Sequence, residues 1–253
     1  MRIASYFGAD YERYSLRLEK NFLYFFILVS GFFIVFPHVD IDVSRYFYRA
    51  GDFVIAQHPY WVALRDYHRL SQFYIIGLLL MLLLVYATSR RPLNAISPHK
   101  IVYAVLTFAF GPGVLVQTLK FIIGRARPRH LMEFGGTADF TPAWQFANAC
   151  RHSCSFPSGE SAAASAMLSL LILVPRPYRV WAAGFLVPLL VSISLNRVFM
   201  GAHFLSDVVI AWVLIIGLMI WLWPGVARNA DTIDNWFRQK GSGLRKRLYK
   251  QID

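Results

Sequence analysis

The sequence contains few charged residues. Only 16% of its 253 residues are Asp, Glu, Lys or Arg, whereas 57% are hydrophobic. The charges are bunched and the apolar residues occur in long runs. This distribution excludes an ordinary soluble domain and is typical of a protein that crosses a membrane several times.

Acidic residues are scarce: 14 Asp and Glu stand against 26 Lys and Arg, which gives a formal net charge of +12. In a soluble protein this excess would indicate a nucleic-acid partner. Here many of the basic residues flank apolar runs, so we expect them to contact anionic membrane lipids on the cytoplasmic side and expect no nucleic acid. The oligomeric state stays open.

Only two cysteines occur, Cys150 and Cys154, four positions apart. With only His152 between them they fall short of the four ligands of a structural zinc site. A disulfide, if the loop faces an oxidising compartment, and a pair of free thiols both fit this spacing.

Six apolar runs predict six transmembrane helices, so the expected fold class is all-α, with residues 1–253 forming a single polytopic membrane domain. The runs cover residues 22–36, 72–87, 101–119, 161–174, 180–195 and 208–226. Gly111-Pro112-Gly113 should bend or loosen the third helix. The fourth is short and rich in Ala and Ser, which permits close packing.

Three polar segments complete the expected layout. Residues 1–20 are predicted to form a cytoplasmic or interfacial N-terminal segment, residues 38–70 a polar connection at the membrane boundary, and residues 227–253 a basic cytoplasmic tail. Six helices place both termini on one side, and the distribution of Lys and Arg assigns that side to the cytoplasm.

Three polar clusters interrupt the apolar runs, at residues 120–128, 156–160 and 197–207. They supply the cations Lys120, Arg127 and Arg197, a Ser-Gly turn that can open a helix, and a histidine followed four residues later by an aspartate. These are the parts needed to hold a phosphoryl group and attack it. The expected topology places all three clusters on the outer side, where they can converge.

The third cluster contains the candidate nucleophile. His203 and Asp207 would share one face of a helix beginning near Gly201, so the carboxylate can accept from one imidazole nitrogen and leave the other free. In the second cluster, a helix that starts at Ser158-Gly159 directs free backbone N–H groups towards the preceding loop and forms an anion site. Arg125 lies within the first cluster and Arg129 directly after it. They could bind further phosphate or sugar groups, but we interpret them as surface charge.

These clusters resemble the three motifs of the PAP2 (type 2 phosphatidic acid phosphatase) superfamily. The family pattern is Lys, six residues, Arg-Pro; then Pro-Ser-Gly-His; then Ser-Arg, five residues, His, three residues, Asp. Lys120 to Arg127-Pro128 keeps the first spacing, and Arg197, His203 and Asp207 keep the third. The chain departs from the pattern twice, with Glu160 in the place of His and Asn196 in the place of Ser.

The resemblance implies a role for each matching residue. Lys120, Arg127 and Arg197 would bind phosphate oxygens together with Ser158 and Gly159, His203 would form a phosphohistidine, and Asp207 would orient it. No cluster of acidic residues suited to Mg²⁺ lies outside the motifs, so we expect no metal and no cofactor.

Glu160 stands where the family has its general acid, and an ordinary Glu is ionised at neutral pH. Three interpretations stay open: Glu160 is protonated in a partly dry site, His152 or His130 takes the role, or the leaving group needs little help. The last would favour lipid diphosphates or lipid A-like glycosyl phosphates.

The resemblance therefore implies a bacterial inner-membrane lipid phosphatase with its active site on the periplasmic side. Its lipid phosphate substrate would be of the lipid A, undecaprenyl diphosphate or phosphatidylglycerol phosphate type. A phosphotransferase that uses the same phosphohistidine, and a non-catalytic lipid-binding or transport protein, are the alternatives.

Overall fold

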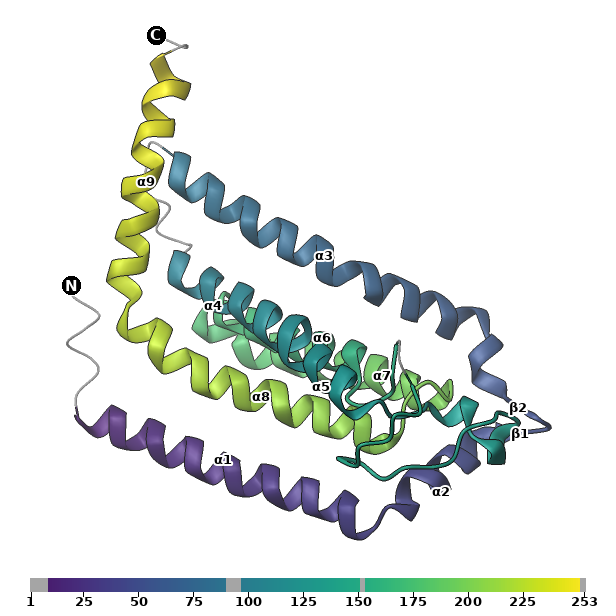
Figure 1. The fold of residues 1–253 in the computed structure, drawn as a ribbon. Coiled ribbons are helices and arrows are strands. Elements are labelled where there is room, and N and C mark those ends of the chain that lie inside the picture. Colours follow the sequence, from purple (N-terminus) through teal and green to yellow (C-terminus); the bar gives the residue numbers. More distant parts are fainter. Residues whose placement is uncertain (1–8, 90–96, 151–152, 251–253) are drawn as a thin grey trace.

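The computed structural model describes residues 9–89, 97–150 and 153–250, and within these ranges it is mainly helical, with a long, largely irregular connection between Ile123 and Gly159 (Figure 1). The α-helices are α1 (Ala9–Val35), α2 (His38–Phe47), α3 (Pro59–Thr88), α4 (Pro98–Phe108), α5 (Val116–Ile123), α6 (Gly159–Ala166), α7 (Arg179–Phe199), α8 (Leu205–Arg228) and α9 (Ala230–Lys250). Two short strands, β1 (Tyr48–Arg49) and β2 (Asp52–Phe53), pair as an antiparallel hairpin. Short 3₁₀ segments cover Val54–Gln57, Pro128–His130, Met132–Phe134, Met167–Ile172 and Arg176–Tyr178.

Five helical segments are long and apolar enough to cross a membrane, namely Arg13–Val35, Pro59–Thr88, Pro98–His130, Arg176–Phe199 and Leu205–Arg228. The run predicted as the fourth span forms a shorter apolar helix, Gly159–Ile172. Large side chains such as Phe25, Phe73 and Trp181 are exposed on these helices, as expected of surfaces that face lipid. The chain is a multi-pass membrane protein.

Two helices begin earlier than their apolar runs. The first was predicted to start at residue 22 but α1 begins at Ala9, so much of the predicted N-terminal segment continues the same helix. The second was predicted to start at residue 72, yet α3 begins at Pro59. Proline fits the first turn of a helix, and charged residues there do not interrupt the backbone hydrogen bonds. The predicted polar connection of residues 38–70 is therefore wrong as one segment, because it holds α2, the hairpin and the first turns of α3.

The third span is loosened at its glycines, as predicted. Residues Ala109–Leu115 between α4 and α5 form a π-helical segment that contains Pro112. Proline has no N–H for the helical ladder, and the wider turn accommodates this gap. At Gly111 a Cβ atom would lie 2.6 Å from a methyl carbon of Ile215 on α8, so the π-helical segment and α8 approach closely here.

The short helix α6 lies in the core of the bundle and packs against α7 and α8. Ala162, Ala164 and Ala166 are fully buried against Leu190 of α7 and Ile215 of α8. Small side chains let helix backbones approach closely, which explains why the predicted Ala- and Ser-rich run occupies the centre.

The predicted basic tail is also helical. Helix α9 crosses the ends of α3 and α4 (Figure 1). Phe237 packs beside Leu83 and Ile101, and Asp234 accepts a hydrogen bond of 2.8 Å from the backbone N–H of His99. The apolar residues of this segment therefore pack it against the bundle. The many charged residues around them gave no indication of this packing in the sequence.

The opposite end of the bundle carries α2, the hairpin and the connections that follow α5 and α7 (Figure 1). Two glycines shape these connections. Gly124 ends α5 with φ 61° and Gly201 follows α7 with φ 60°, a left-handed conformation that side chains disfavour. A Cβ atom at Gly201 would lie 2.4 Å from the ring of Phe53. The turn between α7 and α8 is thus fixed against the hairpin.

We expect Gly201→Ala to lower the midpoint of thermal unfolding in detergent and to reduce activity. The left-handed conformation and the clash with Phe53 together should cost about 2 kcal/mol or more. Gly184→Ala in α7 is the matched control, because nothing lies within 4 Å of a Cβ atom there. Equal midpoints for the two variants would contradict this account.

Candidate active site

A cavity of about 620 Å³ lies where the three polar clusters meet. Its lining includes Lys120 at the end of α5, Arg127 in the following loop, Gly159 and Glu160 at the start of α6, and His203 between α7 and α8. The other predicted residues lie just behind this lining: Ser158, Arg197 and Asp207 are buried. The fold therefore brings together the residues that the motif spacings selected.

The start of α6 is built as the sequence predicts. Ser158 is the N-cap, and its Oγ accepts from the backbone N–H of Ser161 at 3.3 Å. Its own N–H donates to the carbonyl of Asp207 at 3.0 Å, which joins the second cluster to the third. The cap directs the first N–H groups of α6 towards the cavity end of the helix.

His203 lies between two carboxylates and is only 2% exposed. Its Nδ1 is 3.6 Å from Oδ2 of Asp207, and its Nε2 is 3.7 Å from Oε2 of Glu160. The predicted helix from Gly201 is wrong in detail, because α8 begins at Leu205 and the histidine precedes it. Asp207 still faces the imidazole while it accepts a hydrogen bond of 2.8 Å from the N–H of Phe204.

Burial lowers the pKa of His203 to about 4, and the nearby charge of Lys120 acts in the same direction. The carboxylates of Asp207 and Glu160 oppose this shift without overcoming it. The imidazole is therefore neutral at pH 7. A neutral ring with Nδ1 directed at Asp207 keeps a lone pair on Nε2 for attack on phosphorus.

Arg125 is fully buried, so its interpretation as surface charge is wrong. Its guanidinium donates to Oδ1 of Asp207 at 2.6 Å and to Oδ2 of Asp40 at 2.9 Å. It also lies 4.1 Å from the ring centroid of Phe204. The sequence does not reveal the contact with Asp40, because this residue lies on α2, far from Arg125 along the chain and outside the three motifs.

Two hydroxyl groups complete this buried network. Ser206 donates to Oδ2 of Asp40 at 2.5 Å, and Ser155 donates to Oδ2 of Asp207 at 2.5 Å. Burial raises the pKa of Asp40 and the charge of Asp207 adds to this, whereas Arg125 lowers it. Arg125 and Ser155 thus hold the carboxylate of Asp207 that faces His203, and Ser206 holds the carboxylate of Asp40.

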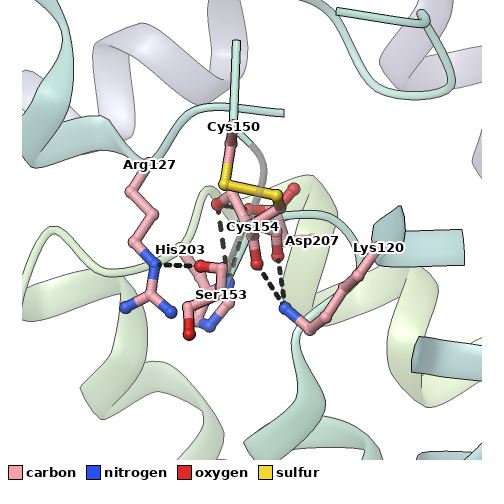
Figure 2. Close-up of a disulfide and its surroundings, with 8 residues drawn as sticks. Lys120, Arg127, Cys150, Ser153, Cys154, His203 and Asp207 are labelled. Atoms are coloured by element: carbon pink, nitrogen blue, oxygen red, sulfur yellow. Dashed lines mark hydrogen bonds and ion pairs between the residues drawn. A yellow bond between two sulfur atoms is a disulfide. The ribbon is translucent and has the colours of Figure 1, made fainter. Parts of the chain in front are cut away.

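The loop before α6 holds two of the predicted cations through its backbone (Figure 2). Lys120 Nζ donates to the carbonyl of Cys154, and Arg127 Nε donates to the carbonyl of Ser153 at 2.9 Å. A disulfide between Cys150 and Cys154 closes this loop, whereas the sequence left bonded and free thiols open. The cross-link therefore restrains the carbonyls that position both cations.

The third cation, Arg197, lies against Glu160. Its Nε is 2.5 Å from Oε2 of Glu160, an ion pair whose N–H does not align for a hydrogen bond. The other oxygen, Oε1, accepts from Nε of Arg69 on α3 at 2.6 Å. Two guanidinium groups on one carboxylate favour its ionised form, which argues against a protonated Glu160 in the structure.

The other candidates for a proton donor lie elsewhere. His130 is exposed and is not among the residues that line the cavity. His152 lies outside the described residues. Within the residues that the structure describes, no group of three or more His, Cys, Asp or Glu could hold a metal ion.

The fold and this site define a membrane protein whose buried histidine faces a cavity lined by cations. Residues 100–231 match the family model of the PAP2 superfamily, and the chain belongs to that superfamily. It is a PAP2-type lipid phosphatase, and thus a hydrolase.

Several characterised bacterial proteins are similar to the chain. A lipid A 4'-phosphatase of Rhizobium leguminosarum is 34% identical over 71% of this chain and 84% of its own length. A lipid A 4'-phosphatase of Francisella tularensis subsp. novicida is 27% identical over 73% of this chain and 84% of its own. A lipid A 1-phosphatase of Rhizobium johnstonii is 35% identical over 42% of this chain and 40% of its own. No solved structure matches the chain significantly.

We expect Arg125→Met to destabilise the protein by about 3–5 kcal/mol, because it leaves two buried carboxylates without their cation. Thermal unfolding in detergent measures the loss. Adding Asp40→Asn to this variant should recover part of the stability, since one unpaired charge is then removed.

Arg129→Met is the control, because Arg129 is exposed and lies four residues after Arg125, outside the network. An Arg125→Met protein that unfolds at the same temperature as the control would show that the network contributes little.

The pH dependence of kcat/KM should report the neutral imidazole. With a pKa of about 4, the imidazole of His203 stays unprotonated as the pH falls from 7 to 5. The activity that depends on this neutral ring should fall only below pH 5. The rate must first be divided by the titration curve of the substrate phosphate, whose second pKa is about 6. A remaining acid limb near pH 6.5, the value of a free histidine, would contradict this prediction.

Proposed function

We propose that this phosphatase removes the 4'-phosphate of lipid A. The two 4'-phosphatases described above match over more than two thirds of the chain. This similarity is the observation on which the proposed substrate rests. The cavity supports a phosphorylated lipid of this kind, because its lining combines cationic with apolar side chains. Residues that line the apolar side include Phe73, Ile76, Phe108, Pro112 and Phe121.

In the proposed reaction Nε2 of His203 attacks phosphorus and forms an N–P bond as the P–O bond to the sugar breaks. Lys120, Arg127 and Arg197, with the N–H groups after Ser158, stabilise the charge on the phosphoryl oxygens. Asp207 keeps the proton of the imidazole on Nδ1 and stabilises the phosphohistidine. Water then attacks phosphorus, which releases inorganic phosphate and restores the neutral histidine.

Glu160 enters this mechanism as a carboxylate, because its two guanidinium partners oppose protonation. It would accept the proton of the water that attacks the phosphohistidine and pass that proton to solvent, which restores the carboxylate. The sugar oxygen would take its proton from solvent. An ionised Glu160 also favours a second candidate reaction, release of the 1-phosphate. The anomeric oxygen leaves more readily than an ordinary alkoxide and needs less help from an acid.

The location of the site belongs to the same proposal. The apolar helix Gly159–Ile172 would complete a sixth crossing beside the five long segments. An even number of crossings would place both termini on one side, and the distribution of Lys and Arg would assign that side to the cytoplasm of a bacterial inner membrane. The cavity would then open on the periplasmic side. Residues 1–253 would act as one domain.

We expect the purified protein to release phosphate from hexa-acylated bisphosphorylated lipid A, and mass-spectrometric fragmentation to place the loss at the 4'-position. His203→Ala should lower the rate at least about a thousandfold, because it removes the nucleophile. His58→Ala, an exposed histidine before α3, is the control. Loss of the 1-phosphate would favour the second candidate, and an active His203→Ala protein would refute the phosphohistidine.

The same assay tests two further parts of the proposal. Activity should persist in EDTA, since three cations replace a metal at the phosphoryl oxygens. Inactivation by EDTA that Mg²⁺ or Zn²⁺ reverses would contradict metal independence. Transfer of the phosphate to an added lipid or sugar hydroxyl, with little free phosphate, would identify a phosphotransferase.

A further inference from the structure

The carboxylate of Glu160 lies where it would meet a bound phosphate. Its Oε2 is 2.5 Å from Nε of Arg197 and 3.7 Å from Nε2 of His203. The proposed function, on which this inference rests, places the phosphoryl group against the same two side chains. A dianion bound there contacts a second negative charge inside a partly buried site, where such repulsion is strong.

Glu160 also occupies one of the site's cations. Arg197 is only 3% exposed. Among the ion pairs of the described residues, the guanidinium of Arg197 contacts the carboxylate of Glu160. If Arg197 alone balanced Glu160, the phosphate would be left with Lys120 and Arg127. The family pattern has a histidine at this position. A neutral histidine would leave the charge of Arg197 available to the phosphate.

Arg69 on α3 supplies the missing charge. Its Nε lies 2.6 Å from Oε1 of Glu160, on the side of the carboxylate away from the Oε2 contact with Arg197. We propose that Arg69 is a positioning residue that neutralises Glu160 and turns its charge away from the phosphate, so that Arg197 is free to bind the phosphoryl oxygens. None of the three sequence motifs contains Arg69.

The packing of α3 fixes Arg69 in this place. The neighbouring His68 is buried, and its Nε2 lies 2.9 Å from the backbone carbonyl of Glu160. Two successive residues of α3 thus contact the same residue of α6, one through its backbone and one through its side chain. The side chain of Arg69 remains 48% exposed and lines the cavity, which leaves room for it to follow the carboxylate when phosphate enters.

This role is tested by measuring the binding of orthovanadate to a cycle of single and double charge variants of the protein in detergent. Vanadate mimics the phosphoryl group and requires no lipid, so its dissociation constant is independent of which lipid the enzyme uses. Arg69→Gln should weaken vanadate binding at least about tenfold, because Glu160 then keeps an unbalanced charge beside the anion. Arg69→Lys keeps the charge and should bind within a few-fold of the wild type.

The double variant Arg69→Gln/Glu160→Gln decides the mechanism. It should restore vanadate binding to within a few-fold of the wild type, because the repelling carboxylate is gone, even if turnover stays low. Arg65→Gln, one turn earlier on α3 and paired with Asp66 at 2.7 Å, is the matched control and should bind normally. Thermal unfolding confirms that each variant is folded.

Two results would overturn the proposal. Normal vanadate binding by Arg69→Gln would show that Glu160 needs no neutralisation from α3. Weak binding that the double variant does not restore would show that Arg69 contacts the anion directly. Because lipid A is absent from the cycle, a failure of the proposed substrate would appear only in the phosphate-release assay and would leave this result unaffected.

Discussion

The candidate active site depends on one buried guanidinium. Arg125 is fully enclosed and binds Asp207 on one side and Asp40 on the other, so it joins the loop after α5 to the start of α8 and to α2. Removing these charges from water is expensive, and only close pairing offsets the cost. The pairing keeps Asp207 ionised behind His203. The orientation of His203, the proposed nucleophile, therefore rests on residues that do not face the cavity.

The cations that face the cavity are held in a different way, by backbone carbonyls. Lys120 and Arg127 donate to the carbonyls of Cys154 and Ser153, in a loop that the Cys150–Cys154 disulfide closes (Figure 2). Neutral acceptors orient a cation without cancelling its charge. Such preorganised charge suits stabilisation of a phosphoryl transition state, because little rearrangement is needed during the reaction.

Glu160 shows how one change in a motif involves a second helix. A carboxylate in the position of the family's histidine adds a negative charge beside Arg197 and His203. Arg69, from a helix outside the motifs, binds the other oxygen of that carboxylate. The local charge is thus balanced across α3 and α6, and the Glu is better suited to act as a base than as an acid.

Apolar run length and short motif spacings are local properties, so the sequence alone predicted a helical membrane protein and the pairing of His203 with Asp207. The convergence of the three clusters followed from the expected order of the membrane spans. It also located the loosened third span at Gly111-Pro112-Gly113. The contacts of Arg125 with Asp40 and Asp207, and of Arg69 with Glu160, became evident only in the folded protein. Each of these pairs joins segments far apart in the chain, and the environment of a charge depends on neighbours that no local pattern specifies.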